Sequence, residues 1–136
     1  MGTTVAPLPR AAATLRISKS AVRHLPVAAR VLIGALFLFS GVVGLVMAPQ
    51  PTPGLPPGAV AFAAALAKTG YMMPLVSATE AIVGLLLLAN RFVPLALALL
   101  APVVVNIVAF HLFLEPGGLP VAAVVAGLEL YLEWSY

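Results

Sequence analysis

Four of the polar side chains inside the long hydrophobic runs are the residues of this chain that could do chemistry. They are Glu80, Asn106, His111 and Glu129. A carboxyl group or an imidazole in an apolar setting can take up or release a proton, and an amide can hold a polar atom of a ligand. An acidic side chain near the middle of a membrane helix costs roughly 2.5 to 3.5 kcal/mol on insertion scales, so such residues are functional hypotheses by default. We therefore take these four as candidates for binding or proton handling.

Each candidate also has a purely structural interpretation. A buried Glu or Asn can join two helices through a hydrogen bond worth roughly 0.6 to 2 kcal/mol. For Asn106 and His111 this structural interpretation is the favoured one. For Glu80 and Glu129 both interpretations remain open.

The composition indicates that these residues are set in a membrane protein. Of the 136 residues, 62% are hydrophobic and 8% are charged, whereas about a quarter of the residues in a soluble domain are charged. The chain has no cysteine, so thiol redox chemistry, disulfides and thiolate metal sites are excluded. A redox role would therefore need a bound cofactor or a partner subunit.

The hydrophobic runs predict an all-α fold with four membrane-spanning helices. A span needs about 20 apolar residues to cross a hydrocarbon core of ~30 Å, and the runs that meet this pattern are residues 27–47, 72–89, 92–114 and 119–136. Residues 48–58 are rich in proline and predict a loop. Residues 59–70 predict a short helix in the first outer loop, with Gly70 at its end, which lies on the membrane surface or in the mouth of the bundle.

Most of the basic residues lie ahead of the first hydrophobic run or at its start. Five of the seven Lys and Arg residues belong to this basic arm, namely Arg10, Arg16, Lys19, Arg23 and Arg30. By the positive-inside rule, both termini are expected in the cytoplasm. Residues 1–26 would then be a cytoplasmic arm that contacts anionic lipid, and residues 27–136 a four-helix up-down bundle. The net charge of +3 does not indicate nucleic-acid binding, because the basic residues form no folded polar face.

The predicted topology places Glu80 and Asn106 at the same depth. We expect Asn106 to tie its helix to the buried face that carries Glu80, with His111 nearer the outer rim and Glu129 near the midplane.

Small and aromatic residues complete this picture. The small residues that should mark close helix packing are Gly34, Gly41 and Gly44 in the first span and Ser77, Ala81 and Gly84 in the second. Aromatic rings near the end of the fourth span are expected to anchor it at the headgroup level, and they are Tyr131, Trp134 and Tyr136.

Several kinds of chemistry are not predicted. Only one histidine, His111, lies at membrane depth, so a haem held by two imidazoles is excluded. The sequence has no metal-ligand cluster, nucleophile elbow or glycine-rich phosphate loop. We therefore expect no metal site and no catalytic site that works without a partner.

The polar landmarks resemble those of the DoxX family of small four-helix membrane proteins. The matching motifs are "TGY" before the second span, E-x-x-x-G-L-L-L-L from Glu80, and "NIVAFHLFLEPGGL" with Asn106 and His111. Arg30, at the start of the first span, is a further landmark. The resemblance implies a multi-pass protein of a bacterial-type inner (plasma) membrane that is linked with redox systems. It also implies quinone as a cofactor and other membrane protein subunits as partners, with no cofactor evident from the residues alone.

Three hypotheses about function follow. The first, which we favour, is a non-catalytic membrane subunit that anchors or organises a redox or electron-transfer complex and contributes to a quinone pocket. The second is a quinone-linked oxidoreductase component in which Glu80 and His111 handle protons. The third is a small-solute or proton transporter that acts as an oligomer, with Glu80, Asn106 and Glu129 along its path.

Overall fold

The structure is a computed structural model that describes residue 2 and residues 19–47, 50 and 52–136. Within these residues every regular element is a helix, and the all-α prediction is confirmed. The elements are α1 (Lys19–Val46), α2 (Pro57–Lys68), α3 (Met72–Leu88), α4 (Val93–Phe113), the 3-10 helix η1 (Pro116–Gly118) and α5 (Leu119–Ser135).

Helix starts and ends follow local sequence signals. Proline occupies the first or second helical position of α2, α4 and α5, where its missing N–H costs little. Gly70 has φ +77° in the corner between α2 and α3, a backbone conformation that L side chains rarely adopt. The helix α1 begins at Lys19 rather than at residue 27, because Ala, Lys, Arg and Leu ahead of the hydrophobic run also favour a helix.

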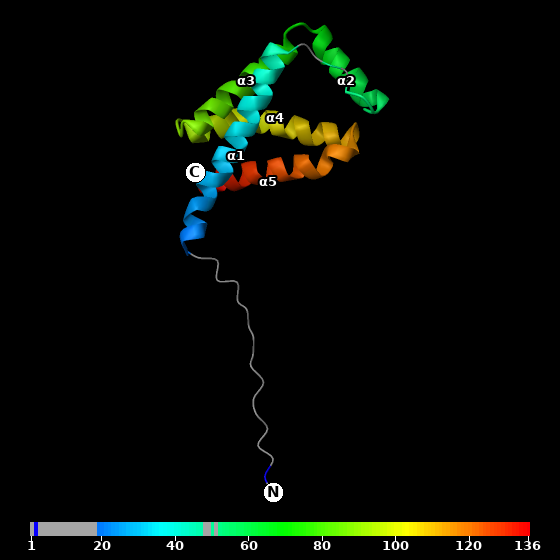
Figure 1. The fold of residues 1–136 in the computed structure, drawn as a ribbon. Coiled ribbons are helices and arrows are strands. Elements are labelled where there is room, and N and C mark those ends of the chain that lie inside the picture. The colour runs from blue at the N-terminus through cyan, green and yellow to red at the C-terminus, as the bar shows by residue number, and fades with distance from the viewer. Residues whose placement is uncertain (1, 3–18, 48–49, 51) are drawn as a thin grey trace.

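The helices form two pairs that open away from each other (Figure 1). The first pair is α1 with α3, and the second is α4 with α5. The pairs approach each other near the C-terminus of the chain and diverge toward α2. The helix α2 extends from the N-terminal end of α3 toward the C-terminal end of α4. The helices α2 and α3 meet at 91°. This arrangement leaves α2 beside the opening between the two pairs.

In the part of the chain that the structure describes, two helices are long and apolar enough to cross a membrane, namely Ala21–Val46 of α1 and α4. A third span exists if α2 and α3 together count as one bent span. The helices α3 and α5 have 17 residues each, which corresponds to about 25 Å, less than a hydrocarbon core of ~30 Å. The expected spans at residues 72–89 and 119–136 therefore form as helices at those positions, but they are short for membrane crossing.

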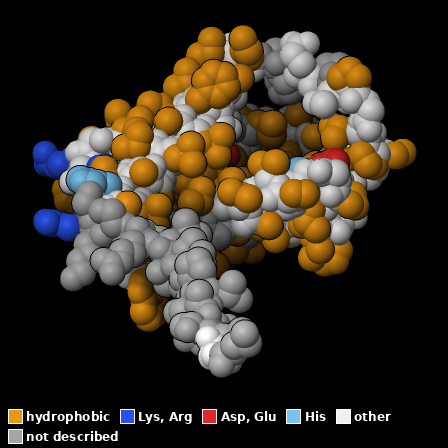
Figure 2. Space-filling model, turned by 60° about the horizontal axis from the view of Figure 1, so that its bottom comes forward, with side chains coloured by type: hydrophobic (Ala, Val, Ile, Leu, Met, Phe, Trp, Pro, Cys, Tyr) orange, Lys and Arg blue, Asp and Glu red, His pale blue; other side chains and the backbone are white. Residues whose placement is uncertain are grey.

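One core joins the four longer helices. Each of them contributes a side chain that is fully buried: Ile33 from α1, Leu87 from α3, Leu100 from α4 and Leu132 from α5. The outer surface is also hydrophobic, with Phe39, Phe113 and other large apolar side chains exposed. Figure 2 shows one such face, on which orange apolar side chains dominate, Lys and Arg gather at one edge, and a hollow opens among the helices.

Candidate functional site

Glu80 lies in the contact between α3 and α1. Its side chain is buried, and its Oε2 accepts a hydrogen bond from the Ser40 hydroxyl of α1 at 2.8 Å. The partner helix is therefore α1, which the sequence did not specify. In this position the carboxyl group joins two helices and does not line any of the three grooves described below.

The close approach of α1 and α3 depends on small residues. A Cβ added to Gly41 would stand 2.8 Å from the Ala81 Cα, and one added to Gly84 would stand 2.7 Å from the Leu38 Cα. Only glycine allows the two backbones to lie this near each other. The expectation that these small faces serve helix packing is confirmed for α1 and α3.

Asn106 lies at a groove bounded by three helices and is separate from Glu80. The groove has a volume of about 340 Å³, and its lining residues are Phe62 and Leu66 of α2, Met72 and Val76 of α3, and Pro102, Val103 and Asn106 of α4. Asn106 forms no hydrogen bond with any residue that the structure describes. The expected tie between Asn106 and the face of Glu80 does not form, because Glu80 faces α1 whereas Asn106 faces the groove beside α2.

His111 lies at the end of α4 and is held by the turn that follows. Its Nδ1 is 2.8 Å from the Glu115 Oε2 and 3.0 Å from the Glu115 backbone oxygen. The same Oε2 accepts a hydrogen bond from the Gly118 N–H at 2.9 Å. This network fixes the imidazole and the turn into α5 together, and Glu115 is a partner that the sequence reasoning missed although it lies one helical turn from His111.

Aromatic rings connect His111 with the groove at Asn106. The Phe110 ring packs edge-on against the imidazole, with 5.2 Å between ring centroids, and against Phe62 of α2 at 5.6 Å. Phe62 also lines the groove. The Phe62–Phe110 pair is therefore a contact between α2 and α4 next to the groove.

Glu129 is a buried acid on α5. Its side chain is 5% exposed, and its Oε1 has no hydrogen-bond partner among the described residues. An unpaired buried oxygen costs free energy. No hydrogen bond or ion pair between described residues joins any two of the four candidates, which are Glu80, Asn106, His111 and Glu129.

Arg30 is buried within the helices, unlike Arg23, which is exposed on the same helix. Its guanidinium donates to the Leu87 backbone oxygen of α3, and its Nε donates to the Tyr136 hydroxyl at 3.1 Å. Arg30, which the sequence groups with the basic arm, therefore lies inside the fold. Its place at the start of the first hydrophobic run was the available signal.

The other residues of the basic arm are less informative. Arg10 and Arg16 lie outside the described residues, and Lys19 is the first residue of α1.

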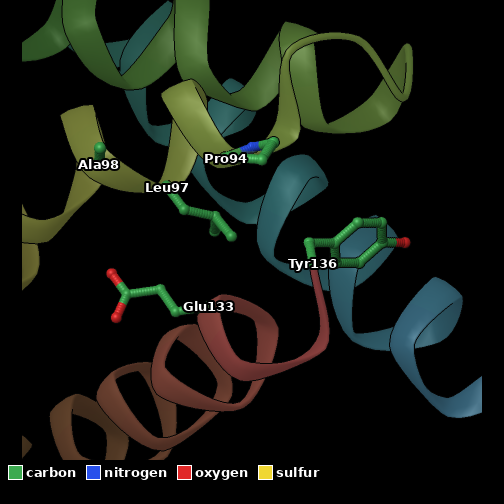
Figure 3. Close-up of a pocket in the computed structure, with 5 residues that line it drawn as sticks. All are labelled: Pro94, Leu97, Ala98, Glu133 and Tyr136. Atoms are coloured by element: carbon green, nitrogen blue, oxygen red, sulfur yellow. The ribbon is translucent and has the colours of Figure 1, made fainter.

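The aromatic residues at the end of α5 differ in their surroundings. Trp134 is 92% exposed, which suits the expected role as an interface anchor. Tyr131 packs against the core. Tyr136 reaches from α5 toward α1 beside a small opening of about 170 Å³, which Glu133 of α5 and Leu97 of α4 also line (Figure 3).

A third groove of about 330 Å³ lies on the other side of α2, and its lining includes Leu55, Val60, Ala64 and Met73. Among the described residues, no group of His, Cys, Asp and Glu side chains could hold a metal ion. The groove at Asn106 is therefore the best candidate for a ligand, because three helices bound it and the Asn106 amide has no hydrogen-bond partner among the described residues.

No family model, no curated protein and no solved structure matches the chain. The resemblance to DoxX proteins stays a prediction from the motifs.

Proposed function

We propose that this chain is a non-catalytic integral membrane subunit that anchors or organises a redox complex. The observation that carries the proposal is the apolar surface, because large hydrophobic side chains are exposed on all five α-helices. Such a surface needs lipid or a partner helix to cover it. The redox part of the proposal rests on the resemblance of the sequence motifs to the DoxX family.

In this proposal the chain crosses a bacterial-type inner membrane four times, with both termini in the cytoplasm. The exposed cations support this orientation, since Arg23 and Arg91 flank the proposed inner ends of the helices and Lys68 alone flanks the outer ends. The short helices α3 and α5 fit if the bilayer thins locally around them.

Cysteine accessibility tests this topology, because the natural chain has no cysteine. Thr52→Cys and Ser135→Cys are both at exposed positions. In spheroplasts, a membrane-impermeant maleimide should label Thr52→Cys at once and Ser135→Cys only after the membrane is permeabilised. Labelling of both before permeabilisation would contradict the topology.

The anchoring role is tested in cells of the native host that no longer produce this chain. Peripheral redox subunits that it holds should move from the membrane fraction to the soluble fraction, and re-expression of the chain should restore them. An unchanged distribution of all redox subunits would refute the anchoring role.

The groove at Asn106 favours a second candidate, a quinone-linked oxidoreductase component. Its apolar walls, the Phe62 ring and the amide of Asn106 suit a quinone, which would supply two-electron redox chemistry when bound. In the isolated complex, Asn106→Leu should raise the KM for quinone, whereas Glu80→Gln, which changes the contact of α1 with α3, should not. An equal effect of the two substitutions on KM would remove the groove from this role.

A further inference from the structure

The groove at Asn106 is bounded by parts of α2, α3 and α4, and the α4 part lies far along the chain from the other two. Its volume of about 340 Å³ falls at the lower end of the range of roughly 300 to 1,000 Å³ that is typical of small-molecule sites. Six of its lining residues are apolar, and Asn106 is the polar one. A lining of this kind suits a hydrophobic ligand with one polar position.

The amide of Asn106 defines that polar position: the residue is exposed, and it forms no hydrogen bond with the residues that the structure describes. Asn106 lies seven residues before Phe113, which places it about 10 Å along α4 from its outer end. At that depth in a membrane, water is scarce, so an amide without a protein partner gains from a ligand oxygen. The amide N–H can donate to a carbonyl or hydroxyl oxygen, and its own oxygen can accept from a hydroxyl.

The lining also determines the charge of the ligand. No charged side chain lines the groove in the part of the chain that the structure describes. A carboxylate, phosphate or ammonium head would therefore lose its hydration without gaining a counter-charge. The groove selects a neutral head.

The helix α2 forms one wall of this groove through Phe62 and Leu66. It meets α3 at 91° through a corner at Gly70, whose φ is +77°. Its Phe62 ring packs against Phe110 of α4.

We propose that this groove binds a neutral amphiphile with a single hydrocarbon chain, whose carbonyl or hydroxyl oxygen is held by Asn106. The chain lies against Leu66, Val76 and Val103, and the head lies beside Phe62. The proposal rests on the membrane location in the proposed function and not on its redox part. Two sources share this chemistry, namely a quinone or quinol and a neutral glyceride lipid.

Binding to the full chain in phosphatidylcholine nanodiscs tests the proposal. The neutral probes are a decyl-substituted benzoquinone and monodecanoylglycerol. The control probes are decylbenzene, which has no polar head, and decanoate, which is charged. Ligand retained per chain is measured by mass spectrometry after subtraction of the amount in empty nanodiscs. At least one neutral probe should bind saturably with about one molecule per chain, and neither control probe should do so.

Three variants locate the binding. Asn106→Leu should weaken binding of the neutral probe about tenfold, the effect of one hydrogen bond in an apolar site. Val103→Phe should abolish it by filling the groove. Val105→Leu is the matched control next to Asn106, because Val105 is 67% exposed and lies outside the lining. This variant should bind the neutral probe with the same affinity as the natural chain. Thermal unfolding of each variant checks that it is folded, and Val76→Phe fills the groove from α3 if Val103→Phe fails to fold.

Each outcome decides the proposal. Tighter binding of the benzoquinone identifies a quinone as the source, and tighter binding of the glyceride identifies a lipid. The proposal would be overturned if the chain retained no more of either neutral probe than empty nanodiscs do. It would also be overturned if folded Asn106→Leu bound the neutral probe as tightly as the natural chain, or if the natural chain bound decylbenzene or decanoate as tightly as the neutral probe. If binding fails while the redox subunits still depend on this chain for membrane attachment, the ligand site is refuted and the anchoring role stands.

Discussion

Substituting alanine for the glycines between α1 and α3 should destabilise the fold, because those glycines set the distance between the two helices. The added Cβ atoms of Gly41→Ala and Gly84→Ala would stand 2.8 Å and 2.7 Å from backbone Cα atoms of the facing helix. Carbon atoms in contact are normally ~3.5 to 4.0 Å apart. The helices must therefore separate by about 1 Å, because a backbone atom cannot turn away as a side chain can.

The size of the effect follows from two opposing terms. Overpacking costs about 1 to 3 kcal/mol, and the better helix propensity of alanine returns about 1 kcal/mol. The net destabilisation is then about 0 to 2 kcal/mol. Gly127→Ala isolates the propensity term, since nothing lies within 4 Å of the Cβ that it would add on α5. Gly41→Ala and Gly84→Ala should thus be about 1 to 3 kcal/mol less stable than Gly127→Ala.

Equilibrium unfolding in mixed micelles with increasing dodecyl sulfate measures this difference through far-UV circular dichroism. The comparison with Gly127→Ala removes effects of detergent and helix propensity that all three variants share. If Gly41→Ala and Gly84→Ala unfold at the same dodecyl sulfate fraction as Gly127→Ala, the close packing of α1 on α3 is not what the structure shows, and the reasoning fails.

Three further substitutions probe the polar contacts between helices, each with the same unfolding assay. Tyr136→Phe removes the hydroxyl that accepts from Arg30 and should cost about 1 to 2 kcal/mol; no change would show that this contact does not hold α5 to α1. Arg30→Lys should cost more, about 2 to 3 kcal/mol, because one ammonium cannot reach both the tyrosine and the α3 backbone. The control Arg23→Lys, at an exposed position, should not change the stability measurably. Equal costs for the two substitutions would contradict the burial of Arg30. Ser40→Ala removes the hydrogen bond to Glu80 and should cost about 1 kcal/mol; a more stable variant would mean that Glu80 does not need this partner.

The helices themselves were predictable because their signals are local. Hydrophobic length, proline at helix starts and the glycine at the α2–α3 corner all act within a few residues. The small faces of α1 and α3 were predictable for a similar reason, since Gly41 and Gly84 can be recognised in the sequence as small residues. The membrane-crossing count was less predictable, because α3 and α5 end after 17 residues each.

The polar contacts were not predictable, since they depend on which helices become neighbours. The face of α3 that carries Glu80 packs against α1, whereas Asn106 lies beside α2 and has no hydrogen-bond partner among the described residues. The contact of Arg30 with Tyr136 joins residues 106 positions apart, and no sequence period links them.

The mass and composition of the native particle test the central claim most directly. Native membranes are dissolved in a mild detergent, separated by native gel electrophoresis, and the band that contains this chain is analysed by mass spectrometry. A membrane subunit of a redox complex should migrate far above its own 13.9 kDa, together with flavin, haem or iron–sulfur subunits in constant proportion. Migration as a monomer or as a homo-oligomer free of redox subunits would contradict the account.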